Sequence, residues 1–392
     1  MSAILSNTSQ PDSEGSKRLD RLLAFLHGDP QNDNLRADVF EQAFSIGNEG
    51  VAEQQLTVGL ELGRDPNAWR FREAHLRMAQ RRFEEAEELL VQLKQQMGPH
   101  PAISHNLAFI AALRGDYQAC FDELQPWAGT DPAEAVDPAI QTLWLKALHH
   151  LGKLELAMQW VDQRQSLAML TPAALGVASL IAIDTDQAIK AKDLADQALQ
   201  GGDAKLEALL ARAAVALAER DTANAHRYLQ QAMQREANNG RCWSTLGLTQ
   251  MLELNITAAR QSLQKAVTLM PGHIGTWHGL GWACLVDKDI DAAQQAFEAA
   301  LQLDRNFGES HGALAIIAAM RGQRDSANER IRRATGLDKD SLSAGYAQAI
   351  LNGAAADPRA LQQAMQHLLS NRMAPMGGSI QDLLPRLPEI KK

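Results

Sequence analysis

Apolar residues recur along this chain at helical spacing, in short blocks separated by polar turns. Trp243, Leu246 and Gly247 fall at positions i, i+3 and i+4, so they share one face of a helix. After a polar turn, Ala259 and Leu263 share one face of a second helix. Small residues on the two faces let the helices cross closely, and large residues fill the space beside the crossing. This block therefore predicts a helical hairpin.

The same pattern returns 34 residues later, with Trp277, Leu280 and Gly281 followed by Ala293 and Phe297. Extending this period in both directions divides the chain into nine units. The position twenty residues into each unit always holds a small side chain, which indicates a repeat array. The units begin at residues 33, 67, 101, 138, 172, 206, 240, 274 and 308. The small residues are Ala52, Ala86, Cys120, Ala157, Ala191, Ala225, Ala259, Ala293 and Ala327.

The order of these residues resembles the tetratricopeptide repeat, a helix-turn-helix unit of 34 residues. The resemblance covers residues 33–341. It implies an all-α, right-handed superhelical solenoid of about nine such repeats with capping helices. Each unit of such an array contacts only its neighbours, so no single central core is expected. In the seventh unit the pattern is carried by Trp243, Leu246, Gly247, Ala259, Leu263, Ala266 and Pro271.

The residues outside the array are predicted to cap it or extend from it. The polar stretch 1–14 should be disordered. The leucine-rich stretch 15–32 should form a helix that covers the apolar end of the first unit. After the array of residues 33–341, a degenerate helix pair over 342–370 is expected to cap the other end. Residues 371–392 are expected to form a flexible tail.

The unit that begins at residue 67 departs from the pattern. Arg70, Glu73 and Arg77 stand where the first helix usually packs, and further arginines and glutamates follow. One interpretation is a set of local ion pairs on a solvated face, each contributing little to stability. The alternative is a docking site for an acidic partner.

The spacing between units grows from 34 to 37 residues after Trp127, where a loop containing glycine and proline is inserted. In the next unit, Leu145 occupies a position where Gly or Ala is expected, and Arg164 occupies a small-residue position. The helix pair here should pack irregularly. We expect a kink of the solenoid at this point.

Composition narrows the classes of function. The chain is 45% hydrophobic and 5% aromatic, with a formal net charge of −9. A general nucleic-acid binder needs a basic surface, so nucleic acid is not expected as a partner. No apolar run reaches the roughly 18 residues of a membrane span, and the N-terminus lacks the signal-peptide pattern, so neither membrane insertion nor export is expected. The spacing of Cys120, Cys242 and Cys284 favours buried, reduced thiols in a cytoplasmic protein.

The sequence carries no motif that supports catalysis, a cofactor or a metal site. Gly279 and Gly281 hint at a dinucleotide loop, but Cys284 stands in place of the third glycine and the repeat explains both glycines. His149 and His150 are adjacent on a helix, so their side chains point about 100° apart and cannot both face one ion without distortion. We therefore predict a protein that is not an enzyme and needs no cofactor.

What remains is a binding surface. In tetratricopeptide-repeat proteins, a stripe of positions on each first helix, including positions 2, 5, 9 and 12, lines the concave groove that holds ligands. One subtype grips peptide carboxylates with Lys and Asn at positions 5 and 9, and no pair of units here supplies them. Carried onto this sequence, the stripe is mixed up to about residue 150 and mainly apolar beyond it. The candidate groove residues are Phe71, His75, His105, Phe109, Lys146, Leu248, Met251, His278, Trp282, Leu285 and Ile316.

Burial between neighbouring first helices is the structural alternative for this stripe. That alternative is open for Leu248 and Leu285, whereas exposure is favoured for Trp282. The function predicted is a non-catalytic adaptor or assembly chaperone that binds an extended or helical protein segment through apolar anchors. The alternatives are a homo-oligomeric scaffold that buries the same groove, or a regulatory or substrate-positioning subunit of an enzyme complex. The tail of the chain, through Leu383 and Leu384, is a further candidate occupant.

Overall fold

Helices account for all the regular structure found in the described residues. The computed structural model describes residues 13–129, 131, 134–166, 168–200 and 205–353. Within these it has twenty α-helices, one short 3-10 helix and no strand. The predicted all-α fold is therefore confirmed. The predictions for residues 1–12, for the second helix of the C-terminal cap and for the tail lie outside the described residues.

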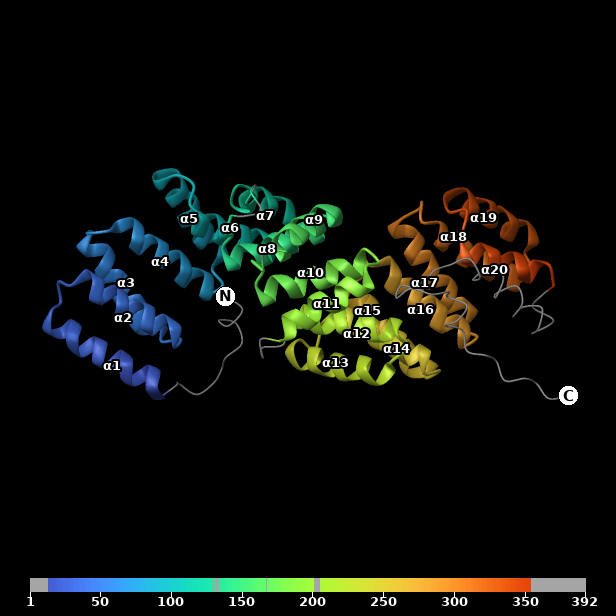
Figure 1. The fold of residues 1–392 in the computed structure, drawn as a ribbon, viewed down its shortest axis with the longest axis horizontal. Helices are drawn as coiled ribbons and strands as arrows, with labels where there is room; N and C mark the ends of the chain where they lie inside the picture. The colour runs from blue at the N-terminus through green and yellow to red at the C-terminus, as the bar shows by residue number, and fades with distance from the viewer. Residues whose placement is uncertain (1–12, 130, 132–133, 167, 201–204, 354–392) are drawn as a thin grey trace. The chain divides into compact units, whose positions relative to one another are not determined.

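The helices belong to two compact units, Met1–Leu170 and Thr171–Lys392. In the N-terminal unit a lone helix precedes four hairpins, which follow one another in chain order (Figure 1). The lone helix buries Leu19 and Leu26 against the first hairpin, as a cap would. The elements are α1 (Ser13–Gly28), α2 (Asp33–Ser45), α3 (Glu49–Leu62), α4 (Pro66–Ala79), α5 (Phe83–Met97), α6 (Pro101–Leu113), α7 (Tyr117–Leu124), η1 (Gln125–Trp127), α8 (Pro138–His150) and α9 (Leu154–Gln165).

The C-terminal unit contains five hairpins and one further helix. In both units the first helix of every hairpin begins within one residue of a predicted unit start. We call α2, α4 and the other even-numbered helices up to α18 the first helices, and their partners the second helices. The elements are α10 (Pro172–Asp184), α11 (Ala188–Leu199), α12 (Leu206–Ala218), α13 (Thr222–Arg235), α14 (Gly240–Leu252), α15 (Ile256–Leu269), α16 (Ile274–Val286), α17 (Ile290–Leu303), α18 (Gly308–Met320), α19 (Arg324–Leu337) and α20 (Leu342–Leu351).

Each of the nine hairpins turns through a residue with left-handed backbone at the fifteenth position of its unit. Four of these residues are glycines, which adopt positive φ without steric cost. The other five carry a side chain at φ between 56° and 64°, a conformation that L-residues avoid. The glycines are Gly47, Gly115, Gly152 and Gly322, and the others are Arg81, Asp186, Arg220, Leu254 and Lys288.

The predicted ladder of small residues lies where the two helices of each hairpin cross. All nine side chains are 0% exposed, from Ala52 to Ala327. Glycine on the facing helix completes the close approach in the regular repeats. A Cβ added at Gly247 would lie 2.5 Å from Cγ of Leu263, and one at Gly281 would lie 2.4 Å from the ring of Phe297. Such contacts exclude any larger residue, which explains the pattern read from the sequence.

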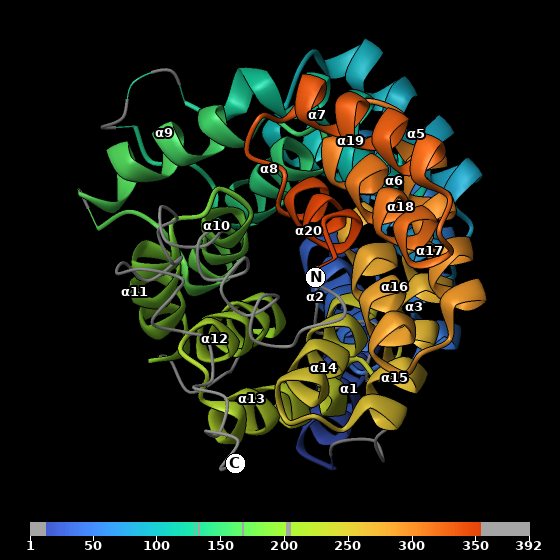
Figure 2. The same cartoon turned by 90° about the vertical axis from the view of Figure 1, so that its right-hand side faces the viewer.

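Within the C-terminal unit, the two kinds of helix lie on opposite sides of a curved stack. Figure 2 shows α12, α14 and α16 on the inner side and α13, α15 and α17 on the outer side. Each second helix also packs against the next first helix, as α15 does against α16. Contacts of this kind join each hairpin to its neighbour.

The arginines of the second hairpin form local ion pairs. Arg72 contacts Glu41 at 3.1 Å, Arg77 contacts Glu73 at 3.2 Å and also pairs with Glu53. These pairs favour the interpretation of the cluster as a local ionic network.

The insertion before α8 is held by a buried arginine. Arg164 is 1% exposed, and its Nη2 donates to the carbonyl oxygens of Ala128 at 3.1 Å and Gly129 at 3.0 Å. Its guanidinium lies 4.3 Å from the ring centroid of Trp160, whose Nε1 donates to the same Ala128 oxygen at 2.9 Å. Arg164 therefore fits its position because the longer loop offers it acceptors, and Leu145 is likewise fully buried.

Candidate functional site

A cavity of about 400 Å³ opens between first helices of the N-terminal unit. The helices α4, α6 and α8 supply its walls together with the capping residues that precede α6 and α8. Three of the residues predicted to face a ligand line it, although they come from hairpins 34 residues apart. The lining residues are Phe71, His75, His100, Pro101, Ala102, His105, Asn106, Asp137, Ala139 and Ile140.

A buried asparagine organises the polar part of this cavity. Asn106 is 3% exposed, and its Nδ2 lies 2.7 Å from Nε2 of His75. An amide nitrogen can only donate, so Nε2 of His75 accepts and its proton resides on Nδ1. The Oδ1 of Asn106 lies 3.3 Å from Nδ1 of His105 and accepts its proton. The Nε2 of His105 is therefore left as an acceptor.

Burial keeps both of these histidines uncharged near neutral pH. Burial, and then the positive charges of His105 and Arg72, lower the pKa of His75 to about 4. Burial also lowers the pKa of His105, although its hydrogen bond to Asn106 and the carboxylate of Asp137 act in the opposite direction. Phe71 packs on the His75 ring, with centroids 4.4 Å apart.

Two helix caps complete the cavity. His100 caps α6, because its Nδ1 accepts from the backbone N–H of Ala102 at 3.2 Å. Asp137 caps α8, because its Oδ1 accepts from the backbone N–H of Ala139 at 2.8 Å. Asp137 is the one permanently charged residue among the lining residues.

The predicted residues of the N-terminal unit are thus only partly brought together. Phe71, His75 and His105 line the cavity. Phe109 is partly buried against the apolar core of α4, α5 and α6, and Lys146 lies on α8 outside the lining. The sequence interpretation missed His100, Asn106 and Asp137. The first and last of these precede prolines at helix starts, a signal for capping that the sequence does contain.

In the C-terminal unit the predicted stripe is a partly exposed apolar strip on α14 and α16. Leu248 is 38% exposed, and Met251 and Leu285 are partly buried against the core. Trp282 is also partly buried. Its ring meets Phe297 edge-on at 5.9 Å between centroids and lies 6.5 Å from the ring of Tyr346.

Two members of the predicted stripe have internal partners. His278 Nε2 lies 2.9 Å from the Ser310 hydroxyl, and burial lowers the pKa of this histidine. Ile316 is 0% exposed and belongs to a core between α18, α19 and α20. The prediction that Ile316 lines the groove is therefore wrong. The cause is α20, which packs against α18.

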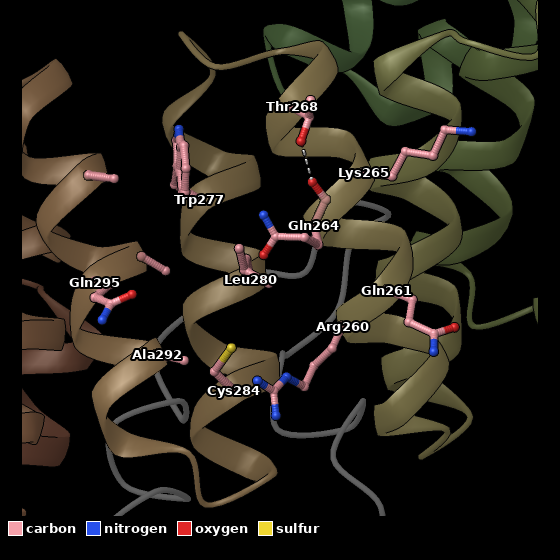
Figure 3. Close-up of a pocket in the computed structure, with 12 residues that line it drawn as sticks. Arg260, Gln261, Gln264, Lys265, Thr268, Trp277, Leu280, Cys284, Ala292 and Gln295 are labelled. Atoms are coloured by element: carbon pink, nitrogen blue, oxygen red, sulfur yellow. Dashed lines mark hydrogen bonds between the residues drawn. The ribbon is translucent and has the colours of Figure 1, made fainter.

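A larger cavity, of about 800 Å³, lies on the side of the second helices (Figure 3). Gln261, Gln264 and Gln295 stand exposed along its rims on α15 and α17, and Leu280 of α16 lies at its floor. Arg260 at one end is held by Asp287 and by Asp289 at 2.8 Å. This cavity is a surface groove with solvated polar rims, and the sequence interpretation did not anticipate it.

The described part of the chain offers no group of three or more His, Cys, Asp or Glu side chains that could hold a metal. Nor does any described helix combine the length and apolarity needed to cross a membrane. Cys120, Cys242 and Cys284 are buried and free, as predicted. Burial raises the pKa of Cys120 to about 12 and that of Cys242 to about 11, so these thiols stay protonated.

Known proteins share this architecture. The family model described as tetratricopeptide repeat matches residues 274–307. A monomeric mutant of IFIT1 with m7Gppp-AAAA is similar in structure, at 14% identity, with 92% of each chain covered and a TM-score of 0.54. The human IFIT1 dimer with PPP-AAAA is similar too, at 14% identity, with 92% of this chain and 91% of that chain covered and a TM-score of 0.53. At this identity the likeness establishes the fold alone. No curated protein matches the sequence.

Proposed function

We propose that this chain, which is a tetratricopeptide-repeat protein, is a non-catalytic adaptor or assembly chaperone that binds a protein segment along its first helices. The fold is one that typically serves as an interaction scaffold. The observation that carries the proposal is the cavity in the N-terminal unit. There Phe71, His75 and His105, from two hairpins, converge on one space that a partner side chain could enter.

The apolar strip in the C-terminal unit supports the same function. Leu248, Met251, Trp282 and Leu285 keep part of their apolar surface in solvent. Covering such side chains contributes about 1.5 to 3 kcal/mol for each one that is fully desolvated, less the cost of ordering the partner. A partner with apolar anchors therefore fits this strip.

Polar contacts in the cavity argue against nucleic acid as the occupant. Neither Lys nor Arg is among the lining residues, and Asp137 would repel a phosphate. The RNA in the complexes of the structurally similar proteins is thus not carried over to this chain. We further propose a cytoplasmic location, which three buried, free cysteines support.

The test is selection of binding peptides from a random display library on the full chain. The affinity of the selected peptides is then measured for three variants. We expect Phe71→Ala or Trp282→Ala to weaken binding severalfold, because each removes an anchor contact. Gln295→Ala, on the second-helix side, is the control and should bind normally. The urea midpoint of each variant separates lost binding from lost stability, since Trp282 also packs on Phe297.

Other results would favour other functions. A library that yields no binder, or binders indifferent to both first-helix variants, would contradict the proposal. Light scattering that shows a dimer dissociated by Trp282→Ala would identify a second copy as the occupant. Tighter binding after deletion of residues 371–392 would identify the tail as a competitor. Catalytic activity in the isolated protein would support the enzyme-subunit alternative.

A further inference from the structure

The cavity of the N-terminal unit is amphipathic in a way that restricts its occupant. Half of its lining residues are apolar and half can form hydrogen bonds. An occupant must therefore bury an apolar body and also satisfy polar groups, because buried polar groups without partners are costly. The apolar half is Phe71, Pro101, Ala102, Ala139 and Ile140, and the polar half is His75, His100, His105, Asn106 and Asp137.

The hydrogen-bonding groups left over by the internal network include both donors and an acceptor. Asn106 occupies Nε2 of His75 and Nδ1 of His105, which leaves Nδ1–H of His75 as a donor and Nε2 of His105 as an acceptor. The Nδ1 of His100 accepts from a backbone N–H, so its Nε2–H is a second donor. A fitting group must both donate and accept.

Charge decides between an ionic and a neutral occupant. Asp137 contributes one negative charge at the edge of the cavity. The N-termini of α6 and α8 border the same space, and each carries about half a positive elementary charge. These contributions nearly cancel, and burial keeps His75 and His105 neutral. Neither a cation nor an anion is attracted, so an uncharged group is favoured.

We propose that this cavity binds the phenol side chain of a tyrosine in the partner protein. The ring packs against Phe71 and Ile140, and the hydroxyl donates to Nε2 of His105 and accepts from a ring N–H of His75 or His100. Phenylalanine would leave these groups unsatisfied, and the indole of tryptophan can donate but not accept. The inference rests on the proposed function, because it names the anchor that the adaptor would recognise.

The test uses amino-acid analogues as probes of the full-length protein. N-acetyl-tyrosine methylamide, its phenylalanine counterpart and its O-methyltyrosine counterpart are titrated at pH 7.5. Binding is followed through the imidazole NMR signals of His75 and His105 in histidine-labelled protein. We expect the tyrosine analogue to shift both signals and to bind about fivefold to tenfold tighter than the other two, the value of one hydrogen bond.

Two variants locate the selectivity. His105→Phe keeps a ring of similar size but removes the acceptor, so the preference for tyrosine over phenylalanine should disappear. His226→Phe is the matched control, because His226 lies on α13 and pairs with Glu253. It should leave the preference intact.

Equal affinity of the unchanged protein for the tyrosine and phenylalanine analogues would overturn the inference, whether or not His105→Phe folds. Shifts confined to other histidines would overturn it as well. Peptides from the display library that bind without tyrosine would refute the inference and leave the adaptor function standing. Analogue binding without any peptide or protein binder would do the reverse.

Discussion

Lys192 on α11 lies 2.8 Å from Glu219, which follows the end of α12, and the two residues are 27 positions apart. This pair joins the twenty-first position of one repeat to the fourteenth position of the next. The same spacing recurs in both units, although the sign of the charges changes along the chain. The other pairs with this separation are Glu87 with Arg114, His226 with Glu253, Arg260 with Asp287, and Gln294 with Arg321.

Reversing one charge of this ladder should have a small and recoverable effect. Lys192→Glu places two carboxylates together, and both positions are about one-third exposed, so we expect a loss of about 1 kcal/mol or less in the free energy of unfolding. The double variant Lys192→Glu with Glu219→Lys should recover most of it. Urea unfolding of both single variants and the double variant measures the coupling. Additive losses would show that the two side chains do not interact.

Overpacking a helix crossing should be far more damaging. Ala293 is 0% exposed between α16 and α17, so Ala293→Leu should destabilise the protein by about 1 to 3 kcal/mol or more. Ala299→Leu on the same helix is the control, because Ala299 lines the open groove of the second-helix side. It should change the urea midpoint little. Similar midpoints for the two variants would refute the assigned register.

Relieving a strained turn should stabilise the array. Leu254 has φ of 61° and is 80% exposed, so it carries the cost of a left-handed backbone and buries little surface. Leu254→Gly should raise the free energy of unfolding by about 0.5 to 1 kcal/mol after the entropic cost of glycine. Leu156→Gly, within α9, should lower it by about 1 kcal/mol. A loss for Leu254→Gly would mean that the turn carries no strain.

Acid should destabilise the N-terminal unit through His75. Its pKa falls from the ordinary 6.5 to about 4 on folding, so the unfolded chain takes up the proton first as the pH is lowered. The contribution is fully present above pH 6.5 and is lost as the pH falls toward 4. Between pH 7.5 and pH 5 the unchanged protein should lose about 1 to 2 kcal/mol more than His75→Gln, in which the amide can still accept from Asn106. Equal losses would show that His75 titrates normally.

The sequence was sufficient for the parts of the fold that repeat. Every crossing needs a small side chain and every unit has the same period, so Ala52 to Ala327 located all nine hairpins. Ile316 shows where this reasoning stops. It occupies a groove position, but Gly312 lets α20 approach so closely that an added Cβ would lie 2.7 Å from the backbone nitrogen of Ala344. A periodic pattern cannot reveal that a terminal helix covers one of its members.

The polar part of the cavity could be predicted only in fragments. His75 and His105 were placed by their repeat positions, whereas Asn106 lies one position outside the stripe and joins them through side-chain geometry. Arg164 is similar, because the acceptors that make its burial tolerable belong to a loop with no repeat counterpart. Contacts that depend on side-chain direction or on an insertion are not encoded in the period.

The helix α1 buries Leu19 and Leu26 on the first hairpin, and every hairpin that follows is built from residues close together in the chain. During synthesis the ribosome therefore releases the covered end first and then one closed hairpin after another. Each new hairpin finds its docking surface already formed by its predecessor. The apolar surface exposed at any moment on the growing chain is then about that of one hairpin face. An array of this kind can emerge vectorially without waiting for its last residues to be translated.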